Sequence, residues 1–274
     1  MPLPTLNLIG AGRVGRTLAR LWHSHGLLAV QDVLTQSETS VQAAVSFIGA
    51  GMPAPDIATM READFWLIAT PDGEIRAAAQ SLAACGRAPS VVFHGSGALP
   101  AAELAPLAQA GWHTASVHSL LSFANPSTAL IQFGGTVCAL EGDEAALQAL
   151  QPLYQAIGGR CFALSAEHKL IYHAAAVWAT NFLPVLQAQA EALWQQSGLP
   201  EELIPELRQR LLRNAVDNVL AQGPADALTG PAARGDLGLV QRQAQALTAL
   251  DADTGAAYAA LSALAQRLAG NRRL

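Results

Sequence analysis

The first fifteen residues constrain the fold more than any other part of the chain. An apolar run at residues 6–9 indicates a buried strand, and a helical pattern of apolar side chains begins at Val14. Between them, Gly10 suits a tight turn, Gly12 permits close approach of a pyrophosphate, and Gly15 lets the helix pack on the strand. This order predicts dinucleotide binding, because a helix N-terminus also attracts phosphate. The alternative is an ordinary glycine-rich turn.

Composition indicates a globular protein and excludes several other classes. The 274 residues are 51% hydrophobic and 14% charged, and the net charge of −5 comes without a basic cluster, which argues against nucleic-acid binding. Three widely spaced cysteines fit neither a disulfide framework nor a zinc site, so we expect a reducing compartment and no metal. The most apolar long segment, residues 170–186, is interrupted by His173, Asn181 and Pro184, and no secretory signal is recognisable. We therefore expect a cytoplasmic protein without a membrane span.

The pattern of elements changes near residue 164. Apolar runs predict strands at residues 6–9, 27–34, 65–69, 90–94, 114–118, 136–140 and 161–164. Helical patterns lie between them, which is typical of a doubly wound α/β sheet, so we predict a dinucleotide-binding domain over residues 1–164. Residues 165–274 show only helical patterns, at 165–196, 205–221, 239–249 and 254–268, and are predicted to form an all-helical domain for substrate binding and dimerisation.

The first of these helices has two further expected features. It is apolar nearly all round at residues 174–186, so we expect burial on several sides, either inside the helical domain or against another chain. Pro184 lacks a backbone donor and crowds the carbonyl of Thr180, which predicts a kink.

The end of the second strand bears on the choice of cofactor. An acidic residue there usually binds the ribose hydroxyls of NAD, but the one candidate, Asp32, lies inside the strand pattern. The small polar side chains at residues 35–37, with Arg13 and Arg16 across the glycine loop, suit a 2′-phosphate better. We therefore predict NADP(H) in preference to NAD(H). The alternative is that both arginines are merely solvated.

Polar residues follow several other strands, where ligands of parallel sheets bind. Thr70 is predicted to line the cofactor groove, and Asp72 to cap the next helix. His94 and His118 end neighbouring strands beside serines, and we expect one of them to contact substrate or nicotinamide. The alternative for each histidine is a hydrogen-bonded structural role. The residues predicted to bind the cofactor are Gly10, Ala11, Gly12, Arg13, Val14, Gly15, Thr35, Gln36, Ser37, Thr70, Pro71, His94 and Ser96.

Candidate catalytic residues lie at the start of the helical half. Lys169 and His173 are one turn apart and share a helix face; we predict Lys169 as a proton donor oriented by His173, with His118 as a third catalytic candidate. The alternative is a snorkelling lysine and a core histidine. Arg234, in a polar loop at residues 227–236, is a candidate for binding a substrate carboxylate, against an ion pair or a free surface arginine. Ser119 and Asn181 complete the predicted substrate-binding set.

Together these motifs resemble a class of reductases in which a Rossmann domain precedes an all-helical, dimerising domain. The class includes 6-phosphogluconate and 3-hydroxyisobutyrate dehydrogenases, ketopantoate reductase and pyrroline-5-carboxylate reductase. The chain is most similar to its bacterial Rossmann-like oxidoreductases with a C-terminal domain of unknown function. The resemblance rests on Gly10-x-Gly12-x-x-Gly15, Ala69-Thr-Pro-Asp72, His94-Gly-Ser-Gly97, Val117-His118, Lys169-x-x-Tyr172-His173, Asn181-Phe-Leu183 and Leu228-Thr-Gly-Pro231 with Arg234-Gly-Asp236.

The resemblance implies NADP(H) as cofactor, a helical domain like that of 6-phosphogluconate dehydrogenase, and a homodimer formed through it. In the hydroxyacid and ketopantoate enzymes a catalytic lysine is followed four residues later by asparagine; Lys169 matches the lysine, and His173 occupies the asparagine position. We expect an NADP-dependent oxidoreductase acting on a small polar carbonyl, hydroxyacid or imine in a cleft between the two halves. The alternatives are a non-catalytic NADP(H)-binding regulatory or scaffold protein, and a helical interaction module that binds no nucleotide.

Overall fold

The computed structural model describes residues 2–270 of the chain. The chain forms two compact units, Met1–Thr180 and Asn181–Leu274, which are described separately here. The strands of the first unit end at Ala163, and the residues that follow, up to Thr180, group with the sheet. The predicted domain boundary at 164/165 remains a prediction.

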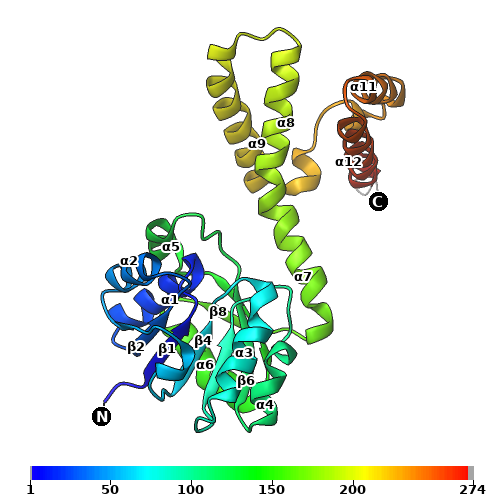
Figure 1. Cartoon of the computed structure of the whole chain (residues 1–274). Coiled ribbons are helices and arrows are strands. Elements are labelled where there is room, and N and C mark those ends of the chain that lie inside the picture. The colour runs from blue at the N-terminus through cyan, green and yellow to red at the C-terminus, as the bar shows by residue number, and fades with distance from the viewer. Residues whose placement is uncertain (1, 271–274) are drawn as a thin grey trace. The chain divides into compact units, whose positions relative to one another are not determined.

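The first unit is built on one eight-stranded sheet with the order β3-β2-β1-β4-β5-β6-β7-β8 (Figure 1). The strands are β1 (Thr5–Ile9), β2 (Ala29–Leu34), β3 (Met52–Pro53), β4 (Phe65–Ile68), β5 (Val91–His94), β6 (His113–Ser119), β7 (Val137–Gly142) and β8 (Arg160–Ala163). Every predicted strand is present; β3 was missed because it has only two residues, both exposed. Strands β1 to β6 are parallel, whereas β7 is antiparallel to β6 and β8 is parallel to β7.

Helices cover both faces of this sheet. They are α1 (Arg13–Ser24), α2 (Glu38–Ile48), α3 (Ile75–Ala84), α4 (Ala105–Gln109), α5 (Pro126–Gln132) and α6 (Glu144–Ala156). A further helix, α7 (Lys169–Ala176), follows β8. Successive side chains of a strand point to opposite faces, so Leu67 packs in the core under α1, α2 and α6, while Trp66 and Ile68 pack in the core under α3 and α4. Strands buried on both faces explain the continuous apolar runs of the sequence.

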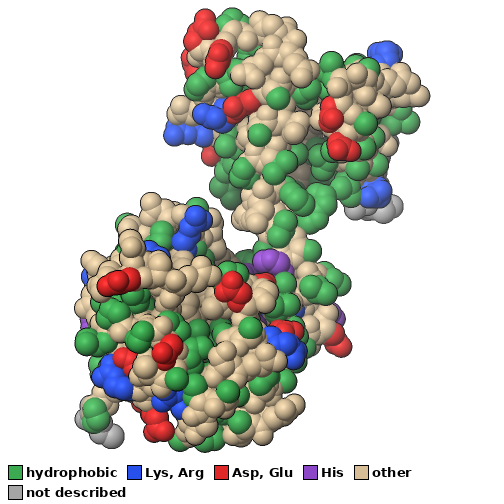
Figure 2. Space-filling model, in the orientation of Figure 1, with side chains coloured by type: hydrophobic (Ala, Val, Ile, Leu, Met, Phe, Trp, Pro, Cys, Tyr) green, Lys and Arg blue, Asp and Glu red, His purple; other side chains and the backbone are tan. Residues whose placement is uncertain are grey.

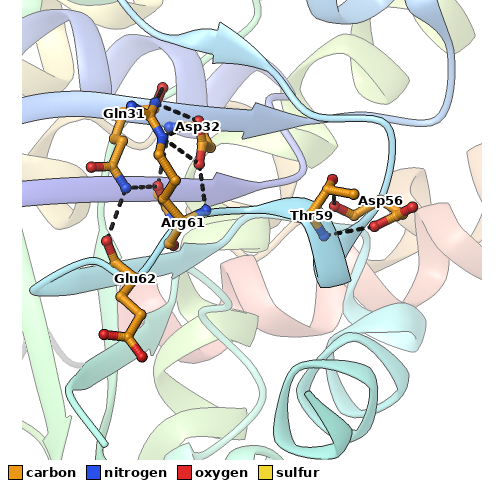
Figure 3. A network of polar contacts seen from close by, with 7 residues as sticks. Gln31, Asp32, Asp56, Thr59, Arg61 and Glu62 are labelled. Atoms are coloured by element: carbon orange, nitrogen blue, oxygen red, sulfur yellow. Dashed lines mark hydrogen bonds and ion pairs between the residues drawn. The ribbon is translucent and has the colours of Figure 1, made fainter. Parts of the chain in front are cut away.

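A buried carboxylate joins β2 to the segment before β4 (Figure 3). Asp32 accepts hydrogen bonds from the backbone N–H of Arg61 at 2.6 Å and from its guanidinium at 2.6 Å, and Asn7 bonds both the backbone N–H of Asp32 and the carbonyl of Arg61. Both oxygens of Asp32 are therefore occupied. This agrees with the interpretation that Asp32, inside its strand, does not bind a ribose.

The Asp32–Arg61 pair predicts a pH dependence of stability. Burial raises the pKa of Asp32, but the hydrogen bonds and charge of Arg61 outweigh burial and hold that pKa below its usual value. A lowered native pKa stabilises the fold above the unfolded pKa of about 3.9, and this contribution is lost as the pH falls through the native pKa. We expect Asp32→Asn to cost about 1–2 kcal/mol at pH 7 and progressively less below pH 4, measured by urea unfolding at each pH. An unchanged difference at pH 3 would contradict this assignment.

The long helix predicted at residues 165–196 is divided by a π-helical turn. α7 ends at Ala176, the π turn spans Val177–Asn181, and α8 covers Phe182–Gln196. Pro184, near the start of α8, cannot donate to Thr180, and the wider turn accommodates its ring. The π turn ends three residues before Pro184, and the kink expected at this proline remains a prediction.

The second unit is helical throughout its regular part, as predicted. Besides α8 it contains α9 (Ile204–Ala227), α10 (Pro231–Arg234), α11 (Leu237–Leu250) and α12 (Ala252–Gly270). The loop expected at residues 227–236 includes the short α10, and Asp236 caps α11 by accepting the N–H of Leu239 at 3.0 Å. None of the helices described in residues 2–270 is both long enough and apolar enough to cross a membrane.

This helical unit has little core of its own. Among its described residues, Ile204, Val240, Gly255 and Ser262 are buried. Figure 2 shows hydrophobic side chains on its surface. The large exposed ones include Phe182, Leu183, Val185, Leu186, Leu211, Val216, Val219, Leu220, Leu237, Leu250, Leu261 and Leu264. Residues 174–186 were expected to be buried either inside the helical domain or against another chain; Ala174, Ala175 and Phe182 of this stretch are exposed in the structure.

Candidate functional site at the carboxyl ends of the parallel strands

The turn after β1 can be made only with glycine at two positions. Gly10 has a φ of +83°, and a Cβ added there would lie 2.7 Å from the carbonyl carbon and oxygen of Ala69 and the nitrogen of Thr70. A Cβ on Gly15 would lie 2.8 Å from the Cβ of Ala69. Close packing of α1 and its turn on the end of β4 therefore accounts for both glycines.

Gly12 is glycine for a different reason. Its φ of −64° is open to any residue, and an added Cβ would have no neighbour closer than 3.9 Å. It occupies the N-cap of α1, where no side chain caps the helix and the first turn carries no acidic residue. Arg16 braces the turn by donating from Nε to the carbonyl of Ala11 at 3.0 Å. The exposed N-terminus of α1 is thus open to an anion.

Polar groups after β4 face this turn. The hydroxyl of Thr70 is buried and has no hydrogen-bond partner among the described residues, so it is a polar atom that a ligand could satisfy. Asp72 begins a 3₁₀ turn and makes no capping bond; its carboxylate accepts the hydroxyl of Ser96 at 2.8 Å. The prediction that Asp72 caps the helix is therefore wrong. Its carboxylate is hydrogen-bonded to Ser96, in the loop after β5, and not to the backbone at the start of the helix.

The loop after β2 is internally bonded. Thr35 contacts the carbonyl of Ser37 and the hydroxyl of Ser40, and Ser37 caps α2 in a capping box with Ser40. The exposed Gln36 donates to the carboxylate of Glu74 at 3.4 Å. Since the strand order is β2-β1-β4, this contact joins the loops on either side of the glycine turn. A carboxylate that the sequence analysis missed therefore stands among the residues predicted to bind a 2′-phosphate.

His94 has a structural role. It is fully buried, its Nδ1 accepts the N–H of Ser96 at 3.2 Å, and its Nε2 therefore carries a proton and faces the carbonyl of Pro100 at 3.1 Å. Burial lowers the pKa of His94 to about 4, so the ring is neutral. Both nitrogens serve the loop after β5, which corrects the expectation that this side chain contacts a cofactor.

Lys169 is also buried, which the predicted role of proton donor did not anticipate. Its side chain has no exposed surface, and Nζ donates to the hydroxyl of Ser116 at 2.8 Å and to the carbonyl of Ser96 at 3.2 Å. Burial lowers the pKa of Lys169, while the carboxylates of Glu141 and Asp72 act in the opposite direction. Placed in this way, the ammonium group is covered by protein atoms and bonded to Ser96 and Ser116.

His118 and His173 come together beside Gly97. Their rings are 5.6 Å apart and nearly perpendicular, and Nδ1 of His118 lies 3.0 Å from the hydroxyl of Tyr172. A Cβ on Gly97 would lie 2.9 Å from Nε2 of His118 and 2.5 Å from Nδ1 of His173. This Nδ1 atom is buried and has no hydrogen-bond partner among the described residues. Burial, then the charges of His173 and Lys169, lower the pKa of His118 to about 4. The predicted catalytic residues Lys169, His118 and His173 thus lie in one cluster.

The predicted substrate-binding residues do not join this cluster in the first unit. Ser119 points to the opposite face of β6 from His118, and its hydroxyl lies 3.6 Å from the sulfur of the buried Cys138. Asn181 and Arg234 belong to the second unit, so their roles remain predictions. Tyr172 and Ser116 were not assigned roles from sequence; Ser116 lies two residues before His118, on the same strand face, which is the signal that could have found it.

Comparisons with known proteins agree with this architecture. Residues 3–119 match the family model of the Rossmann-like domain, and residues 136–265 match the domain of unknown function DUF2520. The chain joins a Rossmann-like domain to a DUF2520 domain. No curated protein sequence matches it. In the part of the chain that the structure describes, no group of three or more His, Cys, Asp or Glu is placed to hold a metal.

Several solved structures share the fold over nearly the whole chain. Protein TM1727 from Thermotoga maritima is 25% identical, with a TM-score of 0.76, covering 98% of this chain and 100% of that one. BF3122 from Bacteroides fragilis, a proposed NADP oxidoreductase, is 20% identical with a TM-score of 0.79, covering 97% and 99%. An imine reductase from Myxococcus stipitatus in complex with NADP⁺ is 17% identical with a TM-score of 0.63, covering 96% and 93%. The Rossmann-like and DUF2520 domains therefore occur together in a fold shared with oxidoreductases.

Proposed function

We propose that this Rossmann-like/DUF2520 chain is an NADP(H)-dependent oxidoreductase acting on a small polar carbonyl, hydroxyacid or imine compound. The observation that carries the proposal is the open N-terminus of α1 at Gly12, beside the buried, unpartnered hydroxyl of Thr70. Solved proteins of the same fold that are described as NADP oxidoreductases and imine reductases support it.

The residues present fit a nicotinamide dinucleotide. The N–H groups at the start of α1 would hold the pyrophosphate, and Gly12 leaves room for it. Thr70 would satisfy its hydroxyl on the cofactor, and Arg13, exposed on the first turn of α1, would contact a 2′-phosphate. When bound, the cofactor supplies or accepts a hydride at this rim of the sheet.

A thermal-shift titration with NADPH, NADH, NADP⁺ and NAD⁺ tests the proposal. A ligand at about one hundred times its dissociation constant stabilises the native state by about 2.7 kcal/mol, so a clear upward shift is expected with NADPH. If NADPH binds, the protein would then be assayed for NADPH oxidation with a panel of carbonyl and imine compounds. No shift with any of the four nucleotides would overturn the oxidoreductase proposal and favour a helical interaction module.

One observation favours a second candidate, a protein that binds NADP(H) without turnover. The predicted proton donor, Lys169, is fully buried and its ammonium group is bonded to Ser96 and Ser116. NADPH binding without oxidation across the carbonyl and imine panel would support this regulatory or scaffold role.

Glu74 is expected to weaken NADP(H) binding relative to NAD(H). Its carboxylate contacts Gln36 in the loop where a 2′-phosphate would bind, and like charges a few ångströms apart repel even in water. We expect Glu74→Gln to lower the ratio of the NADPH and NADH dissociation constants by about three- to tenfold at low salt, and by less at high salt. Glu144→Gln, on α6, is the control for a general charge effect. An unchanged ratio would show that Glu74 does not lie near the 2′-position.

We also propose that the chain forms a homodimer through its helical unit, as the resemblance implies. The many exposed large hydrophobic side chains of α8, α9 and α11 support this, because contiguous apolar patches on a protein surface often mark an interface. Light scattering coupled to size-exclusion chromatography should give twice the 28.5 kDa of one chain. A monomer across the micromolar range would contradict the homodimer.

A further inference from the structure

Lys169 contacts the backbone of the turn after β5. Its ammonium group donates to the carbonyl of Ser96, and Ser116, its other acceptor, donates to that same carbonyl at 3.1 Å. Ser96 is held from its other side by Asp72, through a 2.8 Å hydrogen bond. Lys169 therefore fixes the backbone that leads into Gly97.

The position of the turn at Gly97 also determines where the His118 ring lies. Gly97 is buried, and it lies so close to the rings of His118 and His173 that an added Cβ would fall 2.9 Å from Nε2 of the first. Both histidines reach Gly97 from other elements, His118 from β6 and His173 from α7. A shift of the turn would therefore move or release the His118 ring.

Tyr172 contacts one of the two ring nitrogens of His118, and its hydroxyl can serve that nitrogen either as a donor or as an acceptor. Its hydroxyl lies 3.0 Å from Nδ1, while Nε2 has no hydrogen-bond partner within residues 2–270. Tyr172 holds its proton, because burial raises its pKa to about 12, so the hydroxyl can donate to Nδ1 and leave the proton of the ring on Nε2. A neutral imidazole of this kind can polarise an uncharged acceptor atom.

We propose that His118 is the residue that contacts the substrate, donating from Nε2 to the carbonyl oxygen or imine nitrogen that reacts, and that Lys169 is a positioning residue that acts through Ser96 and Gly97. This inference rests on the proposed function and reverses the roles expected from sequence. It makes the substrate's reacting atom an uncharged acceptor. Besides Tyr172, the charged and titratable groups acting on His118 are His173, Lys169 and Asp72.

Nuclear magnetic resonance of the full chain labelled with ¹⁵N-histidine tests the proposal without a substrate. His118→Gln identifies the His118 signals. We expect a neutral ring with its proton on Nε2 at pH 7, and Tyr172→Phe should change the ratio of the two tautomers. Saturating NADP⁺ should shift the His118 signals but not those of His113, which lies at the opposite end of the same strand. A proton on Nδ1, or bound NADP⁺ that leaves His118 unchanged, would overturn the contact with substrate.

The role of Lys169 is tested in the same experiment. Lys169→Met removes the charge and the two hydrogen bonds, and should raise the titration midpoint of His118 by about half a pH unit or more. Lys169→Arg keeps the charge and should stay near the parent value. Equal midpoints in all three proteins would overturn the positioning role. Absence of NADP⁺ binding by thermal shift would overturn the proposed function and the inference with it, whereas binding without an effect on His118 overturns the inference alone.

Discussion

A Gly12→Ala chain is expected to fold like the parent and to bind NADPH at least about tenfold more weakly. The backbone at Gly12 already has a conformation open to alanine, and the nearest neighbour of the added methyl group would be the carbonyl oxygen of Ala69 at 3.9 Å. That methyl group would project over the N-terminus of α1, where the pyrophosphate needs close approach to the backbone. Thermal unfolding without ligand and NADPH titration by protein fluorescence measure the two quantities.

Gly10→Ala is the matched comparison and should show the opposite behaviour. Its methyl group would lie 2.7 Å from three backbone atoms of Ala69 and Thr70, directly after β4, at a positive φ, so we expect a loss of about 3 kcal/mol or more in stability. A Gly12→Ala protein that binds NADPH as tightly as the parent would contradict the proposed cofactor site, whatever Gly10→Ala does.

Gly255→Ala is expected to separate α11 from α12 and so to unfold much of the helical unit. An added Cβ would lie 2.7 Å from the backbone nitrogen and Cα of Thr248, and would also meet its hydroxyl. Since the neighbour is helix backbone, no side-chain rotation can relieve the overlap, and a cost of about 3 kcal/mol or more is expected. Hydrogen exchange followed by mass spectrometry should show lost protection in both helices.

The control for this variant is Gly238→Ala in α11. Its Cβ would have no neighbour closer than 3.8 Å, so replacing a helical glycine should leave protection unchanged or raise it slightly. Protection of α11 and α12 that survives Gly255→Ala would show that the two helices do not pack as closely as described.

Local features of this fold could be predicted from sequence, and distant contacts could not. The strands and the turn at Gly10 follow from apolar runs and from a backbone that only glycine adopts. Asp72 was assigned to a cap because its true partner, Ser96, is 24 residues away. The burial of Lys169 depends on Ser96 and Ser116, which are more than fifty residues distant in the chain. A helical pattern cannot show which strands a helix will cover.

In the helical half, too, local structure could be predicted from sequence and the packing of the helices could not. Its long helices were predicted, because the periodicity of apolar residues is a local signal. The sequence could not predict whether its apolar stretches are covered by the same chain or by another one, since an apolar stretch has the same pattern in both situations. Phe182 and Leu186 are exposed in the second unit.

The reversed direction of β7 and β8 explains why α7 can serve the site at all. β8 runs against β6, so the chain leaves the sheet heading away from the glycine turn and α7 returns toward it, contacting Ser116 through Lys169 and then His118 through His173. Four residues of helix advance about 6 Å and two residues of strand about 6.6 Å. The distance along α7 from Lys169 to His173 therefore matches the distance along β6 from Ser116 to His118. One residue inserted after Lys169 would rotate His173 by about 100° and break the match. The four-residue spacing of Lys169 and His173 in α7 is thus matched to the two-residue spacing of Ser116 and His118 in β6.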